Sequence, residues 1–249
     1  MTVAIGVLIE QLRRGGARGR VASRRLEQMG RKATRALCVA YDSPEEHFRW
    51  EIVNLLGYTR DPRAIPLLCR RGIHDPEIHP RWRSIWALTS VDDGTVTAIL
   101  RRQIRRERGV RRRHAAVALS LYRDPAALAV LRRGLGSRSG WIRWESASCL
   151  AGYADARSSA RILELYGREK DPSVRKEMVR AVEGVADRRV ERFLRRRLSS
   201  LQPEIREVAA SALMQTFGER SVTALQKRLE REPDPAVRNT MRAALRVRR

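Results

Sequence analysis

Two tryptophan–glutamate pairs supply residue types that could act on an aromatic ligand. They are Trp50-Glu51 and Trp144-Glu145, and an arginine precedes each pair. An indole ring can stack on a nucleobase, and a carboxylate beside it can accept or donate a proton. Because the same Arg-Trp-Glu triplet occurs twice, we expect the elements that carry it to be copies of one repeated unit.

The net charge of the chain is its most unusual bulk property. The 249 residues include 52 basic and 28 acidic side chains, which gives a formal charge of +24. Hydrophobic residues make up 43% of the chain, which is enough for a substantial core and excludes a disordered polyelectrolyte. A folded protein of this charge is expected to bind a polyanion, with nucleic acid as the first candidate and an anionic membrane surface as the second.

Residues that could hold a metal or form disulfides are few. Cys38, Cys69 and Cys149 are far apart and in no Cys-x-x-Cys arrangement, which favours a reducing compartment. The segment 74–79 contains two histidines and two acidic residues, but Asp75 is better explained as a helix cap. We therefore expect no metal and no cofactor.

The apolar segment 3–9 is too short to span a membrane, and no basic segment precedes it as in a signal peptide. The sequence therefore predicts a cytoplasmic protein without a membrane span. It leaves the oligomeric state open.

A unit of about 31 residues recurs along the chain. Four positions recur in this unit at fixed offsets. They are an arginine near its start, then a leucine or valine, then an aspartate, and then a further apolar residue. The arginines are Arg49, Arg81, Arg112, Arg143, Arg175, Arg206 and Arg238. The aspartates are Asp61, Asp93, Asp124, Asp155 and Asp187. We predict that these two columns form a ladder of ion pairs and helix caps between successive units.

Each unit is predicted to fold as two helices. Apolar residues at helical spacing, such as Ile52, Val53 and Leu56, form the buried stripe of the first helix. An Asp-Pro or Ser-Pro step, as at Asp75 or Ser43, is expected to cap that helix, and the aspartate of the unit is expected to cap the second. No stretch alternates with the two-residue period of a strand.

Stacking of these helix pairs is required because one pair of this size cannot bury both of its faces. The sequence therefore predicts an all-α protein, a right-handed α-solenoid of about seven two-helix repeats in a single domain over residues 1–249. We expect a divergent N-terminal cap at 1–42, regular repeats at 43–232 and a C-terminal capping helix at 233–249.

Three segments carry a resemblance to a known family. DPSVRKEMVRAV, PEIREVAASAL and DPAVRNTMRAAL resemble the second helix of HEAT repeats, of the short type found in phycobilisome lyases. The resemblance covers residues 43–249 well and 17–42 loosely. It implies a HEAT-like solenoid whose arginine-bearing helices line a concave surface. HEAT repeats serve adaptors, enzymes and nucleic-acid binders alike, so the resemblance implies a fold and leaves the function open.

The excess positive charge is expected to gather at two places. A basic residue stands near the end of most second helices, and stacking would align these residues along one edge. They are Arg70, Arg102, Arg133, Arg196 and Lys227. The arginine-rich run 101–114 adds Arg105, Arg106, Arg112 and Arg113. We predict contacts from both groups to phosphates or acidic side chains, although arginine also stabilises a helix C-terminus by itself.

Tryptophans follow the repeat arginine in three units. Trp50, Trp82 and Trp144 occupy this position, and Trp86 and Trp141 lie within one helical turn of it. The position is off the predicted buried stripe. These rings could pack between repeats, anchor a protein partner or stack on bases, and all three roles stay open.

The function predicted from these patterns is a non-catalytic scaffold whose basic surface captures an acidic partner. The leading partner is the nucleic-acid phosphate backbone, without sequence specificity, and the alternative is a protein–protein adaptor that binds an acidic protein. Charge, repeat class and tryptophans are also similar to those of HEAT-like alkylpurine DNA glycosylases. That family uses tryptophans and one acidic residue in a concave cleft, and Glu51 and Glu145 are the acidic residues beside tryptophans here. This chain departs from the family in its short, regular units, and the family's catalytic residues do not map onto it position by position.

Overall fold

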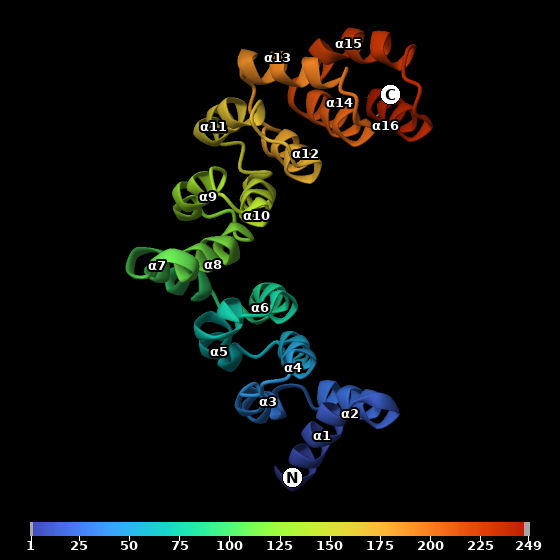
Figure 1. Cartoon of the computed structure of the whole chain (residues 1–249). Helices are drawn as coiled ribbons and strands as arrows, with labels where there is room; N and C mark the ends of the chain where they lie inside the picture. The colour runs from blue at the N-terminus through green and yellow to red at the C-terminus, as the bar shows by residue number, and fades with distance from the viewer. Residues whose placement is uncertain (1, 247–249) are drawn as a thin grey trace. The chain divides into compact units, whose positions relative to one another are not determined.

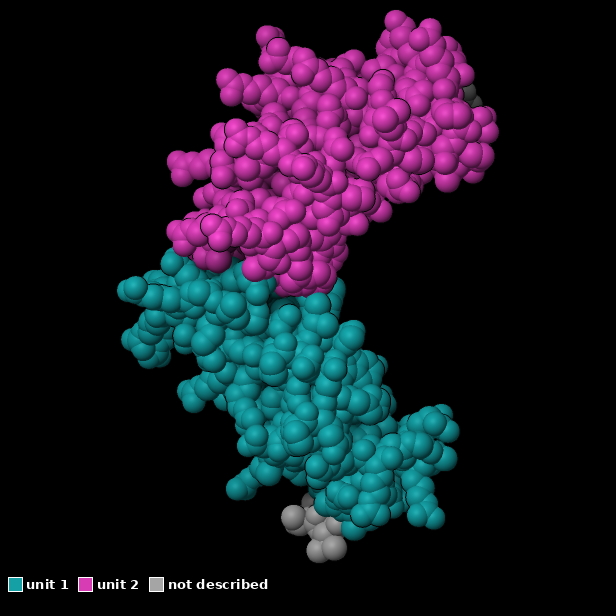
Figure 2. Space-filling view, viewed as in Figure 1, with its two compact units in different colours: residues 1–122 teal, residues 123–249 magenta. Residues whose placement is uncertain are grey.

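The computed structural model describes residues 2–246, and its regular structure in that range is entirely helical. Packing divides the chain into two compact units, Met1–Tyr122 and Arg123–Arg249 (Figure 2). The helices of unit 1 are α1 (Thr2–Arg14), α2 (Gly16–Met29), α3 (Thr34–Ala40), α4 (Glu46–Thr59), α5 (Ile65–Arg70), α6 (Ile78–Val91), α7 (Val96–Arg106) and α8 (Gly109–Ser120). The helices of unit 2 are α9 (Leu128–Gly134), α10 (Gly140–Leu150), α11 (Ala156–Tyr166), α12 (Pro172–Ala181), α13 (Arg188–Arg197), α14 (Pro203–Phe217), α15 (Glu219–Leu229) and α16 (Pro235–Arg246).

Within each unit the helices alternate between two layers (Figure 1). In unit 1, α4 packs on α6 and α5 packs on α7. In unit 2, α10, α12, α14 and α16 pack in succession, and α9, α11 and α13 do the same in the other layer. The repeat arginines all lie on the even-numbered helices from α4 to α16. This is the α-solenoid of two-helix repeats that the sequence predicts.

The apolar columns of the repeat build the core between the layers. Leu56, Leu88 and Leu119 on first helices have no exposed surface, and neither do Leu68 and Leu100 on second helices. Burying a leucine contributes about 1.5–3 kcal/mol, so a column repeated in every unit supplies much of the stability. Periodicity alone therefore identified the buried positions of helices α4 to α8.

Aspartates cap several helices as predicted, but two of the proline steps act differently. Asp171 caps α12, where its carboxylate accepts a hydrogen bond from the backbone N–H two residues later. In contrast, Asp75 and Ser43 lie two residues before the actual N-caps of α6 and α4, which are Glu77 and Glu45. Both side chains still accept a hydrogen bond from the N–H of that cap residue, so they order the turn before the helix.

The repeat arginines form ion pairs, but the predicted partner was wrong. Each of three arginines binds an acidic residue 26 positions further along the chain, in the turn that leads to the next even-numbered helix. The pairs are Arg49–Asp75, Arg143–Glu169 and Arg206–Glu232. Four of the five column aspartates act instead as helix caps, as when Asp61 accepts from the N–H of Arg63, whereas Asp93 lies two residues before Thr95, the N-cap of α7. The ladder therefore links consecutive turns on one side of the stack.

A close approach at Gly72 leads to a stability prediction. A methyl group on Gly72 would lie 2.8 Å from Cβ of the buried Ser84 on α6. Overpacking of this kind costs about 1–3 kcal/mol, so Gly72→Ala should lower the free energy of unfolding in urea by that amount. Gly6→Ala in α1 is the matched control: its methyl would meet no atom within 4 Å, and it should be neutral or stabilising. Equal unfolding midpoints for the two variants would contradict the prediction.

Candidate basic binding surface

The five basic residues predicted at the ends of second helices are all exposed. In unit 1, Arg70 is the last residue of α5 and Arg102 lies on α7. In unit 2, Arg133, Arg196 and Lys227 lie in the last turns of α9, α13 and α15. Each therefore lies in the C-terminal half of a second helix, and the series covers five of the six second helices from α5 to α15, because Glu164 takes this position on α11. We call these five residues the helix-end series.

The neighbours of the helix-end series are engaged in structural contacts. Arg71 pairs with Asp42 at 2.8 Å, and Arg132 pairs with Asp155 at the same distance. The other engaged neighbours are Arg101, Arg195, Arg197 and Arg228. Among the described residues, no member of the series itself forms an ion pair or a side-chain hydrogen bond. In these helices, therefore, the member of the helix-end series lies in solvent, while a basic residue beside it in the sequence takes part in a structural contact.

The arginine-rich run divides into free and partly buried members. Arg105 and Arg106 are exposed in the last turn of α7. Arg112 and Arg113 on α8 are half-buried, and a guanidinium nitrogen of Arg113 lies 3.2 Å from Nε2 of His114. The predicted site therefore keeps Arg105 and Arg106 as free donors, while Arg112 and Arg113 are partly taken up by packing.

A hollow in unit 1 adds three residues that the predicted site did not contain. Arg70 lines it together with Arg71, His74 and Arg111. These residues come from α5, from the turn that follows it and from α8, so their positions in the sequence gave no hint that they meet. Only the stacking of consecutive repeats brings them together.

The tryptophans fall into separate groups in the two units. Trp50 and Trp82 are half-buried on α4 and α6, while Trp86 is 55% exposed. In unit 2, Trp144 stacks on Trp141 with ring centroids 5.0 Å apart, and Trp141 is 41% exposed. Each unit therefore presents one exposed indole, beside or close to a half-buried one. The sequence placed Trp141 within one helical turn of the tryptophan position, and its stacking on Trp144 appears only in the structure.

The two glutamates beside tryptophans differ in environment. Glu145 is buried at 1% exposure, whereas Glu51 is half-buried and lies 4.0 Å from the imidazole of His47. Within residues 2–246, no three histidine, cysteine or acidic side chains gather closely enough to hold a metal ion. Over the same range no helix combines the length and apolarity needed to cross a bilayer.

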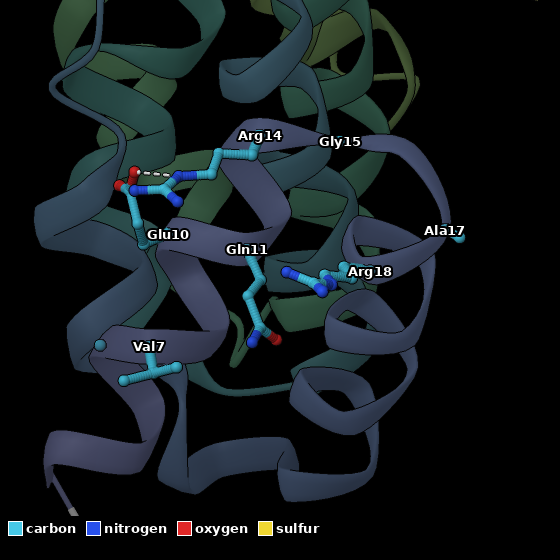
Figure 3. Close-up of a pocket in the computed structure, with 8 residues that line it drawn as sticks. Val7, Glu10, Gln11, Arg14, Gly15, Ala17 and Arg18 are labelled. Carbon is cyan, nitrogen blue, oxygen red and sulfur yellow. Dashed lines mark hydrogen bonds and ion pairs between the residues drawn. The ribbon is translucent and has the colours of Figure 1, made fainter.

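A second hollow, of about 670 Å³, lies between the first two helices of unit 1 (Figure 3). Val7 and Gln11 of α1 face it, and Arg18 of α2 reaches toward it from the other side. Glu10 and Arg14, also at this hollow, pair with each other at 3.0 Å. The sequence did not predict this feature, because it depends on the angle between two helices of the divergent N-terminal region.

Comparison with protein families agrees with this architecture. A family model described as HEAT repeats matches residues 34–120, 72–151 and 159–246. The chain belongs to the HEAT-repeat family. The matches extend over most of the two-helix units and include each member of the helix-end series, so the free basic residues are placed on HEAT repeats.

A solved structure shows the same fold at low sequence identity. The Escherichia coli protein YibA is 18% identical, with a TM-score of 0.59 over 96% of this chain and 91% of that protein. Human deoxyhypusine hydroxylase in complex with glycerol is 21% identical over 97% of this chain and 94% of that one, with a TM-score of 0.40. A search of curated proteins found no match. The likeness to YibA concerns the fold alone.

Proposed function

We propose that this HEAT-repeat protein is a non-catalytic scaffold that holds the phosphate backbone of a nucleic acid. The observation that carries the proposal is the helix-end series, in which five exposed basic residues at equivalent repeat positions lack any ion-pair partner among the described residues. Structural arginines in proteins normally pair with carboxylates, as four neighbours of the series do here, namely Arg71, Arg132, Arg195 and Arg228. Unpaired charges repeated at one helix end are suited to a partner that repeats its own negative charge, such as a phosphate backbone.

The overall charge supports the same partner. The excess positive charge divides equally between the two units, so both units carry a charge that a polyanion can bind. Backbone contacts fix the position of a protein on nucleic acid without reading its sequence, and they release counterions on binding. We therefore infer binding that depends on salt and tolerates any sequence.

The test is the salt dependence of binding to a sequence-scrambled duplex, measured by fluorescence anisotropy. A triple variant of unit 2, Arg133→Gln, Arg196→Gln and Lys227→Gln, removes three proposed phosphate contacts. Since each contact contributes about 0.9 to the slope of log K against log salt, the slope should fall by about 2–3. Affinity at moderate salt should fall with it.

The matched control removes the same charge from the opposite ends of similar helices. Arg157, Arg188 and Arg189 are exposed in the first turns of α11 and α13, and their triple change to glutamine should leave the slope nearly unchanged. Equal slopes for the two triple variants would show that only total charge matters. A protein that binds duplex without any salt dependence would refute the proposal outright.

A protein–protein adaptor is the second candidate, and the stacked pair Trp141–Trp144 favours it. Partly exposed aromatic rings beside arginines are frequent anchors of protein interfaces. An adaptor with a dedicated acidic protein partner should ignore scrambled duplex at physiological salt. The same anisotropy experiment therefore separates the two functions.

A further inference from the structure

The hollow at Arg70 is lined by more arginines than its own carboxylate can balance. Its volume is about 330 Å³, at the lower end of the range for small-ligand sites. Four arginines line it against a single carboxylate, and the remaining lining residues carry no charge at neutral pH. The lining residues are Tyr41, Ser43, Arg49, Arg70, Arg71, His74, Asp75, Pro76 and Arg111. All of them belong to unit 1.

One of the four arginines, Arg49, is held in place by structural contacts. Arg49 is buried, and its Nε and Nη2 donate to both carboxylate oxygens of Asp75 at 2.7 and 2.9 Å. Its remaining nitrogen donates to the carbonyl oxygens of Ser43 and Pro44. Tyr41 donates its hydroxyl proton to the same carboxylate. Asp75 is therefore fully engaged, and it does not neutralise the other three arginines.

Those three arginines keep donors for a ligand. Arg70 has no ion-pair or hydrogen-bond partner within residues 2–246, while Arg71 uses one nitrogen on Asp42, whose side chain is 79% exposed. Arg111 lies 3.3 Å from Glu107, four residues earlier on the chain, and half of its side chain is exposed. A guanidinium carries five N–H donors, so each of these side chains can bind an anion without breaking a buried contact.

A histidine in the hollow also lacks partners. His74 stacks on His114 with centroids 5.7 Å apart, and neither of its buried ring nitrogens has a hydrogen-bond partner in the described part of the chain. A buried polar group without a partner costs free energy, and a ligand that supplies an acceptor would recover it. An imidazole N–H is a suitable donor to a phosphate oxygen.

We propose that this hollow is a binding site for one phosphate group, held by Arg70, Arg71 and Arg111 with His74 as an additional donor. A phosphate offers several oxygen acceptors in a tetrahedral array, which matches guanidinium groups that converge from different helices. The inference rests on the proposed function in one respect: the phosphate is taken to be one of the nucleic acid's. A free phosphate compound has the same chemistry, and the experiment distinguishes the two sources.

The first experiment titrates the full chain with inorganic pyrophosphate by calorimetry, at constant ionic strength set with sodium chloride. We expect one saturable site. Loss of one charged donor should weaken binding about tenfold, so Arg70→Gln and Arg111→Gln should each show that loss. Arg25→Gln, an exposed arginine on α2 outside the hollow, is the control and should bind pyrophosphate like the unmodified chain.

A spectroscopic readout reports the hollow directly. Pyrophosphate should shift the imidazole ¹⁵N signals of His74 and leave those of His47 in place, since the side chain of His47 is 74% exposed and outside the hollow. Absence of a saturable site, or equal loss in Arg25→Gln and Arg70→Gln, would overturn the inference even if duplex binding remains salt-dependent. Saturable pyrophosphate binding without duplex binding would keep the site and refute the nucleic-acid function.

Discussion

Glu232→Ala should destabilise unit 2 by about 3–5 kcal/mol, because the change leaves a buried guanidinium without its carboxylate. Arg206 is 5% exposed, and its Nε and Nη2 donate to the two oxygens of Glu232 at 2.8 and 2.5 Å. Arg228 approaches the same carboxylate at 2.8 Å, so two positive charges lose their partner at once. Urea denaturation followed by circular dichroism measures the loss.

Two further variants separate the buried charge from packing. Glu232→Gln keeps the shape but removes the charge, and it should recover part of the loss. Glu164→Ala removes an acid whose side chain is 63% exposed and paired with Arg161 on the same helix, and it should change stability by less than about 1 kcal/mol. A Glu232→Ala protein as stable as Glu164→Ala would show that the arginine ladder contributes nothing.

Acid should destabilise unit 1 through two histidines, the buried His114 and the half-buried His74. Burial, together with Arg111, lowers the pKa of His74 from 6.5 to about 4. Burial, with Arg81 and Arg113 as further causes, lowers the pKa of His114 to about 3. Because folding lowers the pKa of each histidine, its contribution to stability is fully present at pH values above 6.5, the pKa in the unfolded chain. This contribution disappears as the pH falls from 6.5 toward the pKa in the folded protein. Between pH 6.5 and 4 we expect a loss on the order of 3 kcal/mol for each.

The measurement is the free energy of unfolding as a function of pH, in the unmodified chain and in His114→Phe. The variant keeps an aromatic ring against His74 but cannot be protonated, so its stability profile should be flatter in this interval. The test compares how steeply the free energy of unfolding changes with pH. A variant that is less stable at every pH therefore remains informative. His47→Gln, at an exposed position, should reproduce the unmodified slope. Parallel profiles for the unmodified chain and His114→Phe would contradict the prediction.

The helical repeat was predictable from the sequence because each of its signals is local. The spacing of Leu56, Leu68, Leu88 and Leu100 reports which face of each helix avoids water, and all four are buried. The helix-end series was predictable for the same reason. Charged residues outside the apolar stripe at a helix C-terminus have no core to enter, and Arg70 and its equivalents are exposed.

Contacts between helices were not predictable in the same way. The sequence offered the aspartate column as partner of Arg49 and its equivalents, yet the arginines bind carboxylates in the turn before the next even-numbered helix. An arginine side chain can reach any carboxylate within several ångströms. The column pattern does not show which carboxylate lies nearest once the helices have stacked. The stacking of Trp144 on Trp141 depends on ring orientation, which periodicity also leaves undefined.

The sequence by itself determined that this protein is a stack of helix pairs with a strongly basic surface, because burial and helix formation depend on short-range patterns. Only the tertiary structure decided which of those basic residues are free. Ion pairing depends on distances between side chains from different repeats, and these distances separate the engaged Arg71 from the free Arg70 beside it. The same distances assemble the hollow in unit 1 from residues that lie as far apart in the chain as Tyr41 and Arg111.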